Sequence, residues 1–370
     1  MDLCEQSPAY VRAIAPYQPG KPITELAREL GLDERTIVKL ASNENPRGIS
    51  PKALAAIKAA LPELGRYPDG FELTQALSRR LGVPMQQIVL GNGSNDVLEF
   101  AGMAFLAPGR SAVYSQHAFA VYPLATQARG AQGIVVPAKN YGHDLEAMLA
   151  AIRPDTRVVF IANPNNPTGT MLTAAELESF LVRAPKNVVV VVDEAYNEYL
   201  DPALRCPSIA WIERFPNLIV TRTFSKVYGL AGLRVGYAVC RAEIADLLNR
   251  VRQPFNVNNL AIVAAAAALG DDDFLRQSYE LNVAGMAQLL AGCKRLGVAW
   301  IPSYGNFLTV EIPRAGGASQ AAAVFQKLLR LGVIVRPLAG YDMPDHLRVT
   351  IGLAEENARF LDALQAVLKG

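Results

Sequence analysis

The sequence lacks long hydrophobic runs and any strong excess of one charge. No stretch of about 18 consecutive apolar residues occurs, so the sequence predicts no membrane-spanning helix. The first 20 residues contain neither the cationic nor the apolar segment of a secretory signal. The formal net charge is only +2, which provides no broad electrostatic surface for nucleic acid or an anionic membrane. We therefore expect a protein that binds neither.

Cysteine is scarce as well. The four cysteines are Cys4, Cys206, Cys240 and Cys293; they form no CxxC pair, and no histidine accompanies them at the spacing of a metal ligand. This pattern argues against a disulfide framework and against a zinc site. We expect no bound metal and a reducing, cytoplasmic location.

The sequence does contain a regular alternation of short apolar runs and helical patterns between about residues 50 and 250. Runs such as TRVVFIA and NVVVVVDE are rich in β-branched residues, and a helical pattern follows each of them. Such alternation predicts parallel strands joined by crossover helices, and runs this apolar predict strands buried on both faces. The fold class is therefore α/β.

These patterns divide the chain of 370 residues into three parts. Residues 46–255 should form a large α/β domain. Residues 256–370 begin with two helical patterns and continue with mixed strands and helices, which predicts a smaller α+β domain with one sheet. The proline-rich residues 1–45 are typical of an arm that packs on the rest of the protein.

Polar segments follow four of the predicted strands. GNGSND comes after IVL, NPNNPTG after VVFIA, DEAY after VVVVV, and TFSK after LIV. Parallel α/β sheets bind ligands beyond the carboxyl ends of their strands, where the connecting loops converge. Four such ends with polar groups predict a single site.

Two of these segments, taken alone, are weak indications of a binding site. Gly93, Ser94 and Asn95 open a helix and offer backbone N–H groups to a phosphate, although a tight strand-to-helix turn is by itself the more common reason for such glycines. Asn166 supplies an amide that suits a phenolic oxygen, but asparagines in Pro-Gly loops more often cap turns.

A carboxylate at the end of an apolar strand is more informative. Asp193 should be buried, and a buried carboxylate needs a charged or strongly donating partner. The partner is either a core arginine or the protonated ring nitrogen of a cofactor. Tyr196 follows three residues later and either contacts the same ligand or is an aromatic residue at the rim.

Lys226 lies in TFSKVYGLAGLRVGY, among small and aromatic residues. A single lysine in a sequence is more often an exposed surface residue than a catalytic one. At a strand end beside three other polar strand ends, however, Lys226 is placed to form a Schiff base with a carbonyl cofactor. Thr223, Ser225 and Arg234 would then hold the phosphate of that cofactor.

The combination of NPNNPTG, VVDEAYNEY and TFSKVYGLAGLRVGY resembles the pyridoxal-phosphate-dependent aminotransferases of fold type I over nearly the whole chain. YVRAIAPYQPGKP, LASNENPRG, RYPDG and VIVRPLAGYDMPDHLRVTIG are similar to the histidinol-phosphate aminotransferase family in particular. The resemblance implies a large domain with a mostly parallel seven-stranded sheet between helices, a smaller α+β domain and an N-terminal arm.

The resemblance also implies roles for individual residues. Lys226 would hold the cofactor aldehyde and move protons, Asp193 would bind the ring nitrogen, and Tyr196 with Asn166 would bind the phenolic oxygen. The phosphate would be held by a group of side chains and backbone N–H groups from two loops: Gly93, Ser94, Asn95, Thr223, Ser225 and Arg234.

Two aromatic residues complete the implied cofactor site. Phe119 falls where the family stacks a ring on the cofactor, and Tyr67 falls where the family reaches the phosphate of the neighbouring subunit, which implies a homodimer with shared sites. The chain departs from the family by having Asn95 where Asp is usual and Phe119 where many relatives have Tyr.

For the substrate, the resemblance implies that Arg336 and Arg348 bind anionic groups and that Tyr17 and Asn45 make further contacts. It predicts amino-group transfer between L-histidinol phosphate and 2-oxoglutarate in histidine biosynthesis. The alternatives are an aromatic amino acid aminotransferase, a threonine-phosphate decarboxylase, and a catalytically silent regulator that binds pyridoxal phosphate.

Overall fold

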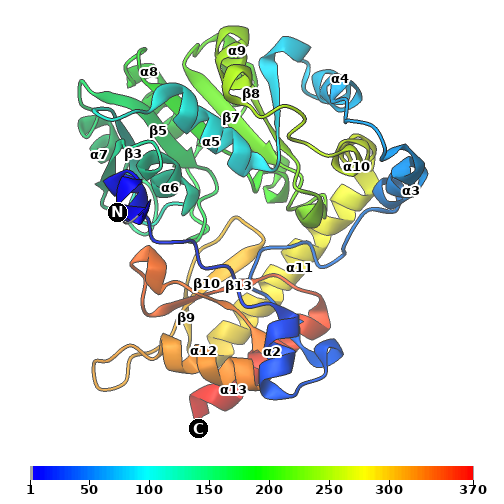
Figure 1. Ribbon diagram of the computed structural model, residues 1–370. Coiled ribbons are helices and arrows are strands. Elements are labelled where there is room, and N and C mark those ends of the chain that lie inside the picture. Colours follow the sequence, from blue (N-terminus) through cyan, green and yellow to red (C-terminus); the bar gives the residue numbers. More distant parts are fainter. Residues whose placement is uncertain (1–2, 370) are drawn as a thin grey trace.

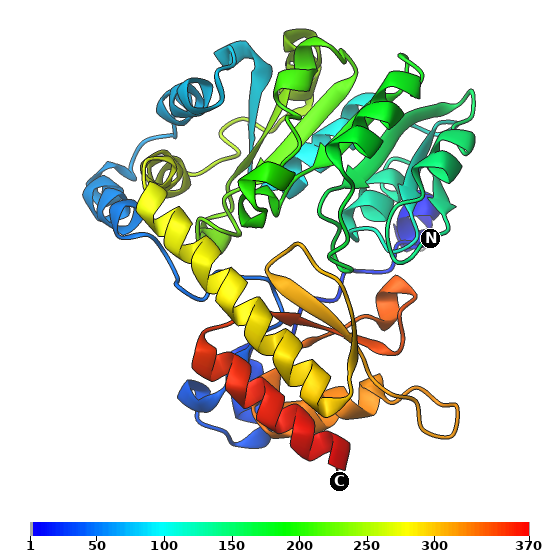
Figure 2. The same ribbon diagram turned by 180° about the vertical axis from the view of Figure 1, so that it is seen from behind.

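The computed structural model describes residues 3–369 and shows two bodies of unequal size (Figure 1). The larger body contains a seven-stranded sheet and the smaller one a four-stranded sheet. Helix α11 (Asp272–Leu296) runs from the larger body into the smaller one, where it lies beside α13 (Ala354–Lys369) (Figure 2). No helix within the described residues is long and apolar enough to cross a membrane.

The large sheet is mostly parallel, as predicted. Only β8 runs against both of its neighbours, and the other adjacent pairs are parallel. From one edge to the other, the strands are β2 (Ile88–Gly91), β8 (Gly236–Cys240), β7 (Leu218–Thr223), β6 (Val189–Asp193), β5 (Thr156–Ala162), β3 (Ser111–Ser115) and β4 (Gln132–Val136).

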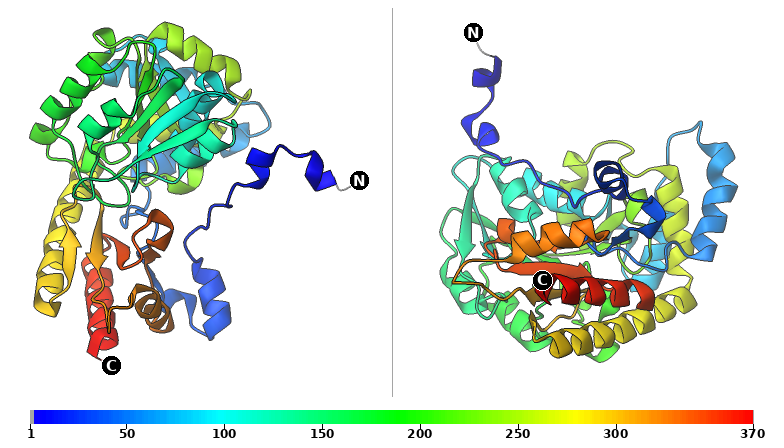
Figure 3. Two further views of the ribbon diagram at one scale, coloured as in Figure 1. Left: turned by 90° about the vertical axis from the view of Figure 1, so that its left-hand side faces the viewer. Right: turned by 90° about the horizontal axis from the view of Figure 1, so that it is seen from below.

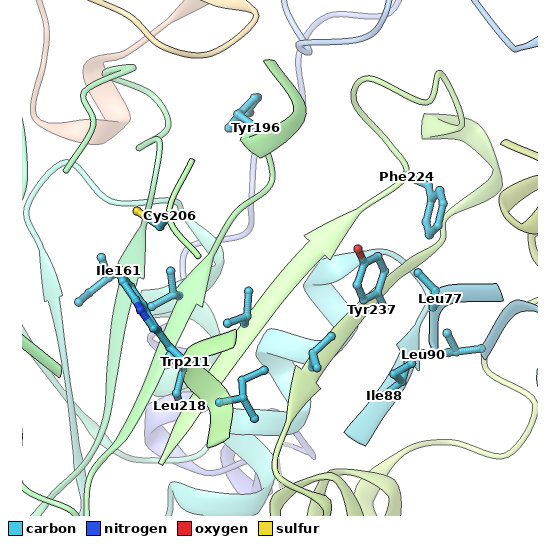
Figure 4. Close-up of a cluster of buried hydrophobic side chains, with 14 of the residues drawn as sticks. Leu77, Ile88, Leu90, Ile161, Tyr196, Cys206, Trp211, Leu218, Phe224 and Tyr237 are labelled. Atoms are coloured by element: carbon cyan, nitrogen blue, oxygen red, sulfur yellow. The ribbon is translucent and has the colours of Figure 1, made fainter. Parts of the chain in front are cut away.

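Successive residues of the central strands pack on opposite faces of the sheet, which explains why the strand sequences are apolar without interruption. Phe160 of β5 belongs to one buried cluster, and Ile161 belongs to the other, part of which Figure 4 shows around Trp211. The first cluster includes residues of α5 (Ser94–Phe105), α6 (Val121–Gln127) and α9 (Ala242–Val251). The second includes residues of α3 (Pro51–Ala60), α4 (Phe71–Leu81), α7 (Leu145–Ala150), α8 (Ala174–Arg183) and α10 (Asn259–Leu269).

The smaller body is an antiparallel sheet with helices on it. Its strands, in order, are β12 (Arg336–Pro337), β13 (His346–Thr350), β10 (Phe307–Glu311) and β9 (Ala299–Ile301), and its core includes residues of α11, α12 (Ala321–Arg330) and α13. A second, two-stranded sheet pairs β11 (Val333–Ile334) with β1 (Val38–Lys39). The segment VIVRP thus contributes to two sheets, whereas the sequence predicted a single sheet.

The N-terminal segment lies along both bodies before the first strand of the large sheet. Helix α2 (Ile23–Leu30) buries Leu26 in a cluster that includes Leu329 and Ile334 of the smaller body. The preceding residues, including α1 (Ala9–Arg12), extend beyond the smaller body (Figure 3), and the backbone oxygen of Tyr10 accepts a hydrogen bond from Nε2 of Gln127 in the larger body over 3.4 Å. The division at residue 255 stays a prediction; α10, which follows it, packs against α3 and α4 of the larger body.

Candidate active site

One cavity lies where the large sheet, the small sheet and the arm meet. It encloses about 200 Å³. The larger body contributes the ends of β5, β6 and β7 and the start of α5; the smaller body contributes Arg336, Tyr341 and Arg348; the arm contributes Tyr17 and Ser42. The carboxyl edge of the parallel sheet therefore lies at this cavity, as expected for an α/β ligand site.

The cavity brings most of the predicted site residues together. Those that line it are Tyr17, Ser94, Asn95, Phe119, Asn166, Asp193, Tyr196, Thr223, Ser225, Lys226, Arg234, Arg336 and Arg348. Gly93 lies immediately beside it, because a Cβ added at Gly93 would clash with Nη2 of Arg234. Tyr67 lies elsewhere, 80% exposed and stacked on Phe255 with 4.5 Å between ring centroids.

The substrate contact predicted for Asn45 stays a prediction, and the structure places this residue outside the cavity lining. The side-chain amide of Asn45 donates to the backbone oxygen of Val227 over 2.7 Å and to Oγ of Ser278 over 2.9 Å. Asn45 therefore ties the segment after Lys226 to α11, and it does not line the cavity. The asparagine that does is Asn43, whose left-handed backbone, with φ of 54°, changes the direction of the chain between the two.

Lys226 is held at the edge of the large sheet with its amine in the cavity. Nζ donates to the backbone oxygen of Ser42 over 3.2 Å and lies 5.7 Å from the centre of the Tyr196 ring. Burial, followed by the positive charge of Arg348, lowers the pKa of Lys226 to about 8. A substantial fraction of the amine is therefore neutral near physiological pH, which a nucleophilic lysine requires.

Asp193 is buried and receives hydrogen bonds from two hydroxyl groups. Tyr122 donates to Oδ2 over 2.9 Å, and Thr221 donates to Oδ1 over 3.1 Å. Burial raises the pKa of Asp193, and both hydrogen bonds oppose that rise. Sequence reasoning missed Tyr122 and Thr221, because their importance arises from neighbours that are distant in the sequence.

Tyr196 is also oriented by a residue that the sequence did not point to. The amide of Asn43 donates to the hydroxyl oxygen of Tyr196 over 2.8 Å, and Thr350 of β13 donates to Oδ1 of Asn43 over 3.2 Å. Burial is the main cause that raises the pKa of Tyr196 to about 12. The phenol therefore stays protonated near neutral pH and can donate a hydrogen bond.

The start of α5 and the loop after β7 form a cradle for an anion. Arg234 extends Nη1 to Oγ of Ser225 over 3.0 Å. Ser94 and Asn95 begin a 12-residue helix whose first N–H groups have no partner within the helix. Gly236 permits the close approach of these two segments, since a Cβ there would clash with the backbone nitrogen of Ser94. Backbone and side-chain donors of this kind fit a phosphate.

The cavity carries more positive than negative charge. Lys226, Arg234, Arg336 and Arg348 all line it, whereas Asp193 is its only lining carboxylate, and none of the four cations forms an ion pair within residues 3–369. Desolvated cations without a carboxylate partner favour an anionic ligand. The cavity is thus suited to ligands with several negative groups.

Arg348 is the most buried of these cations. Nη1 donates to Oδ1 of Asn166 over 2.5 Å, Nη2 donates to the backbone oxygen of Ala41 over 2.7 Å, and burial lowers the pKa of the guanidinium. Its buried Nε has no partner among the described residues. The guanidinium of Arg336 lies 5.3 Å from the centre of the Tyr17 ring. Both arginines can therefore meet a ligand that enters beside the arm.

These groups fit pyridoxal phosphate. The amine of Lys226 suits its aldehyde, the carboxylate of Asp193 suits its ring nitrogen, and the cradle of Arg234 and Ser225 suits its phosphate. The fit uses one continuous cavity and leaves Arg336 and Arg348 for a substrate.

Comparison with known proteins agrees with this chemistry. The family model described as aminotransferase class I and II matches residues 35–364. Histidinol-phosphate aminotransferase 2 of Nitrosospira multiformis is 60% identical over 100% of this chain and 93% of its own length. Histidinol-phosphate aminotransferase 1 of Dechloromonas aromatica is 64% identical over 100% of both chains.

A solved structure extends the likeness to three dimensions. The histidinol-phosphate aminotransferase of Sinorhizobium meliloti, determined in complex with pyridoxal-5'-phosphate, superposes with a TM-score of 0.89. The two chains share 27% identity, and the match covers 98% of this chain and 97% of the other. The predicted fold and family resemblance are confirmed.

Proposed function

Because the chain belongs to the class I and II aminotransferase family, we propose that it exchanges an amino group between L-histidinol phosphate and 2-oxoglutarate, with pyridoxal phosphate as cofactor, in histidine biosynthesis. The products are imidazole acetol phosphate and glutamate. The observation that carries the proposal is the cavity in which Lys226 meets three arginines without carboxylate partners. The relatives named histidinol-phosphate aminotransferase support the choice of substrate.

Lys226 performs the proton transfers. When bound, pyridoxal phosphate supplies an aldehyde that captures the substrate amine and a ring that accepts electrons from the substrate carbon. Lys226 would hold the cofactor through its aldehyde, and binding of the substrate amine would free the lysine amine. With its pKa lowered to about 8, the free amine would take the proton from the substrate carbon and deliver it to the carbon that was the cofactor's aldehyde.

Polar side chains around the ring set the direction of electron flow. The Asp193 carboxylate keeps the ring nitrogen protonated, which strengthens the ring as an electron acceptor. Tyr196 and Asn166 bind the phenolic oxygen, and Tyr196 is available as a donor because Asn43 already donates to its oxygen. Phe119, which lines the cavity, would stack on the face of the cofactor ring.

Anion binding divides into two parts. Ser94, Asn95, Thr223, Ser225 and Arg234 hold the cofactor phosphate, with Gly93 allowing the close approach of Arg234. Arg336 and Arg348 hold the substrate anions.

The two arginines serve both half-reactions. Histidinol phosphate has no α-carboxylate, so its phosphate occupies an arginine that binds a carboxylate of 2-oxoglutarate in the other half-reaction. A guanidinium suits both groups because its N–H donors form a planar fork. Tyr17 lies against Arg336 and lines the site from the arm.

A homodimer completes the site. Tyr67 is 80% exposed and Phe255, on which it stacks, is 58% exposed, so two large aromatic rings face outward together. In the dimer, Tyr67 reaches the cofactor phosphate of the neighbouring subunit. A reducing cytoplasm suits the enzyme because Cys206, Cys240 and Cys293 are buried thiols.

The visible absorption spectrum of purified enzyme tests the proposal. The band of the bound cofactor should disappear on adding histidinol phosphate and return on adding 2-oxoglutarate. A band that responds to aromatic amino acids but ignores histidinol phosphate would identify an aromatic aminotransferase instead. Release of carbon dioxide from threonine phosphate would identify a decarboxylase, and a band that responds to no amine would indicate a silent regulator.

A further inference from the structure

Tyr122 contacts two cavity-lining residues although it does not line the cavity itself. It is fully buried on α6, its hydroxyl donates to Oδ2 of Asp193 over 2.9 Å, and its ring meets the edge of the Phe119 ring at 5.9 Å with an interplanar angle of 84°. On its other side the ring stacks on Phe160 of β5, with 4.8 Å between centroids and 5° between planes. The position of the hydroxyl is therefore fixed by packing.

We propose that Tyr122 is a positioning residue for the cofactor's ring nitrogen. Its hydroxyl fixes the rotamer of Asp193 and keeps that carboxylate a weak enough base to leave the proton on the nitrogen. The inference rests on the proposed function, because it requires pyridoxal phosphate. Tyr122 acts only through Asp193 and touches no reacting atom.

The hydrogen-bonding capacity of a carboxylate explains the arrangement. Its two oxygens offer about four acceptor positions. Tyr122 uses one on Oδ2, Thr221 uses one on Oδ1 and the backbone N–H of Ala195 uses another, which still leaves room for a donor in the cavity. These fixed donors restrict rotation of the carboxylate, so a ring nitrogen meets an acceptor that is already oriented.

The basicity of the Asp193 carboxylate also depends on Tyr122. Burial raises the pKa of Asp193, and the hydrogen bond from Tyr122 is the largest opposing influence. Without that hydrogen bond the carboxylate would be a stronger base and would compete for the shared proton. The other titratable groups around Asp193 are Glu194, Tyr196 and Lys226, and none of them donates a hydrogen bond to it.

A cofactor analogue separates this role from simple packing. The apoenzymes of wild type and Tyr122→Phe are titrated with pyridoxal phosphate and with its 1-deaza analogue, in which C–H replaces the ring nitrogen. We expect the substitution to weaken binding of pyridoxal phosphate about tenfold and to leave the analogue within about twofold. Tyr114→Phe is the matched control, because Tyr114 is also buried but lies on β3 outside the cavity lining.

The outcomes distinguish the alternatives. Equal weakening of both ligands would show that Tyr122 only supports the fold, and unchanged affinity for pyridoxal phosphate would also overturn the inference. If Tyr122→Phe is poorly folded, 3-fluorotyrosine placed at position 122 keeps the packing and provides a stronger donor. Its preference for pyridoxal phosphate over the analogue should then equal or exceed that of wild type, and a lower preference would overturn the inference. A wild-type protein that binds no pyridoxal phosphate would instead contradict the proposed function.

Discussion

Asn43 donates its side-chain amide to the hydroxyl oxygen of Tyr196 over 2.8 Å and thereby joins three parts of the chain. Tyr196 follows β6 of the larger body, and Asn43 lies in the N-terminal segment. On the other side, the backbone nitrogen of Asn43 donates to Oγ1 of Thr350 in the smaller body over 2.9 Å. Since β13 carries both Thr350 and Arg348, this chain of contacts connects Tyr196, which we propose binds the cofactor, with the strand of Arg348, which we propose binds the substrate.

Asn43→Asp should lower kcat by about tenfold with little change in the thermal midpoint. The new carboxylate has nearly the same shape but accepts where the amide donated, so the Tyr196 hydroxyl would turn its proton toward residue 43 and away from the cofactor. Steady-state kinetics with histidinol phosphate measure the effect. In a Tyr196→Phe background the same substitution should cost much less, and an undiminished loss there would contradict the link through Tyr196.

The amine of Lys226 predicts a specific pH dependence of cofactor capture. The amine is nucleophilic only when neutral, so the rate at which apoenzyme captures pyridoxal phosphate should rise with pH and level off above the pKa of about 8. Arg348 is one cause of the lowered pKa, so Arg348→Gln should move the midpoint upward. Stopped-flow absorption between about pH 6 and 10 tests both statements. A midpoint unmoved by Arg348→Gln would exclude that arginine as a cause.

The sequence was informative where local pattern determines structure. Apolar runs predicted the strands, and the end of a parallel strand fixed the place of Asp193 and of Lys226, because neighbouring strands end at one edge. The sequence could not predict contacts between segments that are far apart along the chain. Nothing near Tyr122 in the sequence indicates that it bonds to Asp193, and the pairing of β1 with β11 involves two residues on each side.

The sequence also could not tell which of two neighbouring asparagines lines the cavity. Asn43 and Asn45 are two residues apart in SNENP, and either could face a ligand. The positive φ of Asn43 and the contacts of Asn45 with Val227 and Ser278 decide between them, and both depend on packing of the folded chain. Residue type alone therefore identified the segment and not the residue.

Arg348→Lys should raise the KM for histidinol phosphate and for 2-oxoglutarate together, each by about tenfold or more. Lysine keeps the charge but loses the planar fork that contacts Asn166 and Ala41. Initial rates with each substrate varied in turn measure the change. Arg314→Lys is the control, because Arg314 is an exposed arginine of the same body that pairs with Asp345. An effect on only one substrate would contradict the shared use of Arg348.

A shared active site predicts that two defective variants can restore each other. Lys226→Ala removes the amine that we propose is catalytic, and Tyr67→Ala removes the side chain that we propose reaches the partner's cofactor, so each homodimer should have low activity. In a mixed dimer, one site combines Lys226 of one subunit with Tyr67 of the other, and its partner site has both defects. Mixing the variants under conditions of subunit exchange should therefore raise activity toward one quarter of the wild-type value, because half of the dimers are mixed and each has one intact site. Activity that stays at the average of the two variants would show that Tyr67 acts within its own subunit, where it stacks on Phe255.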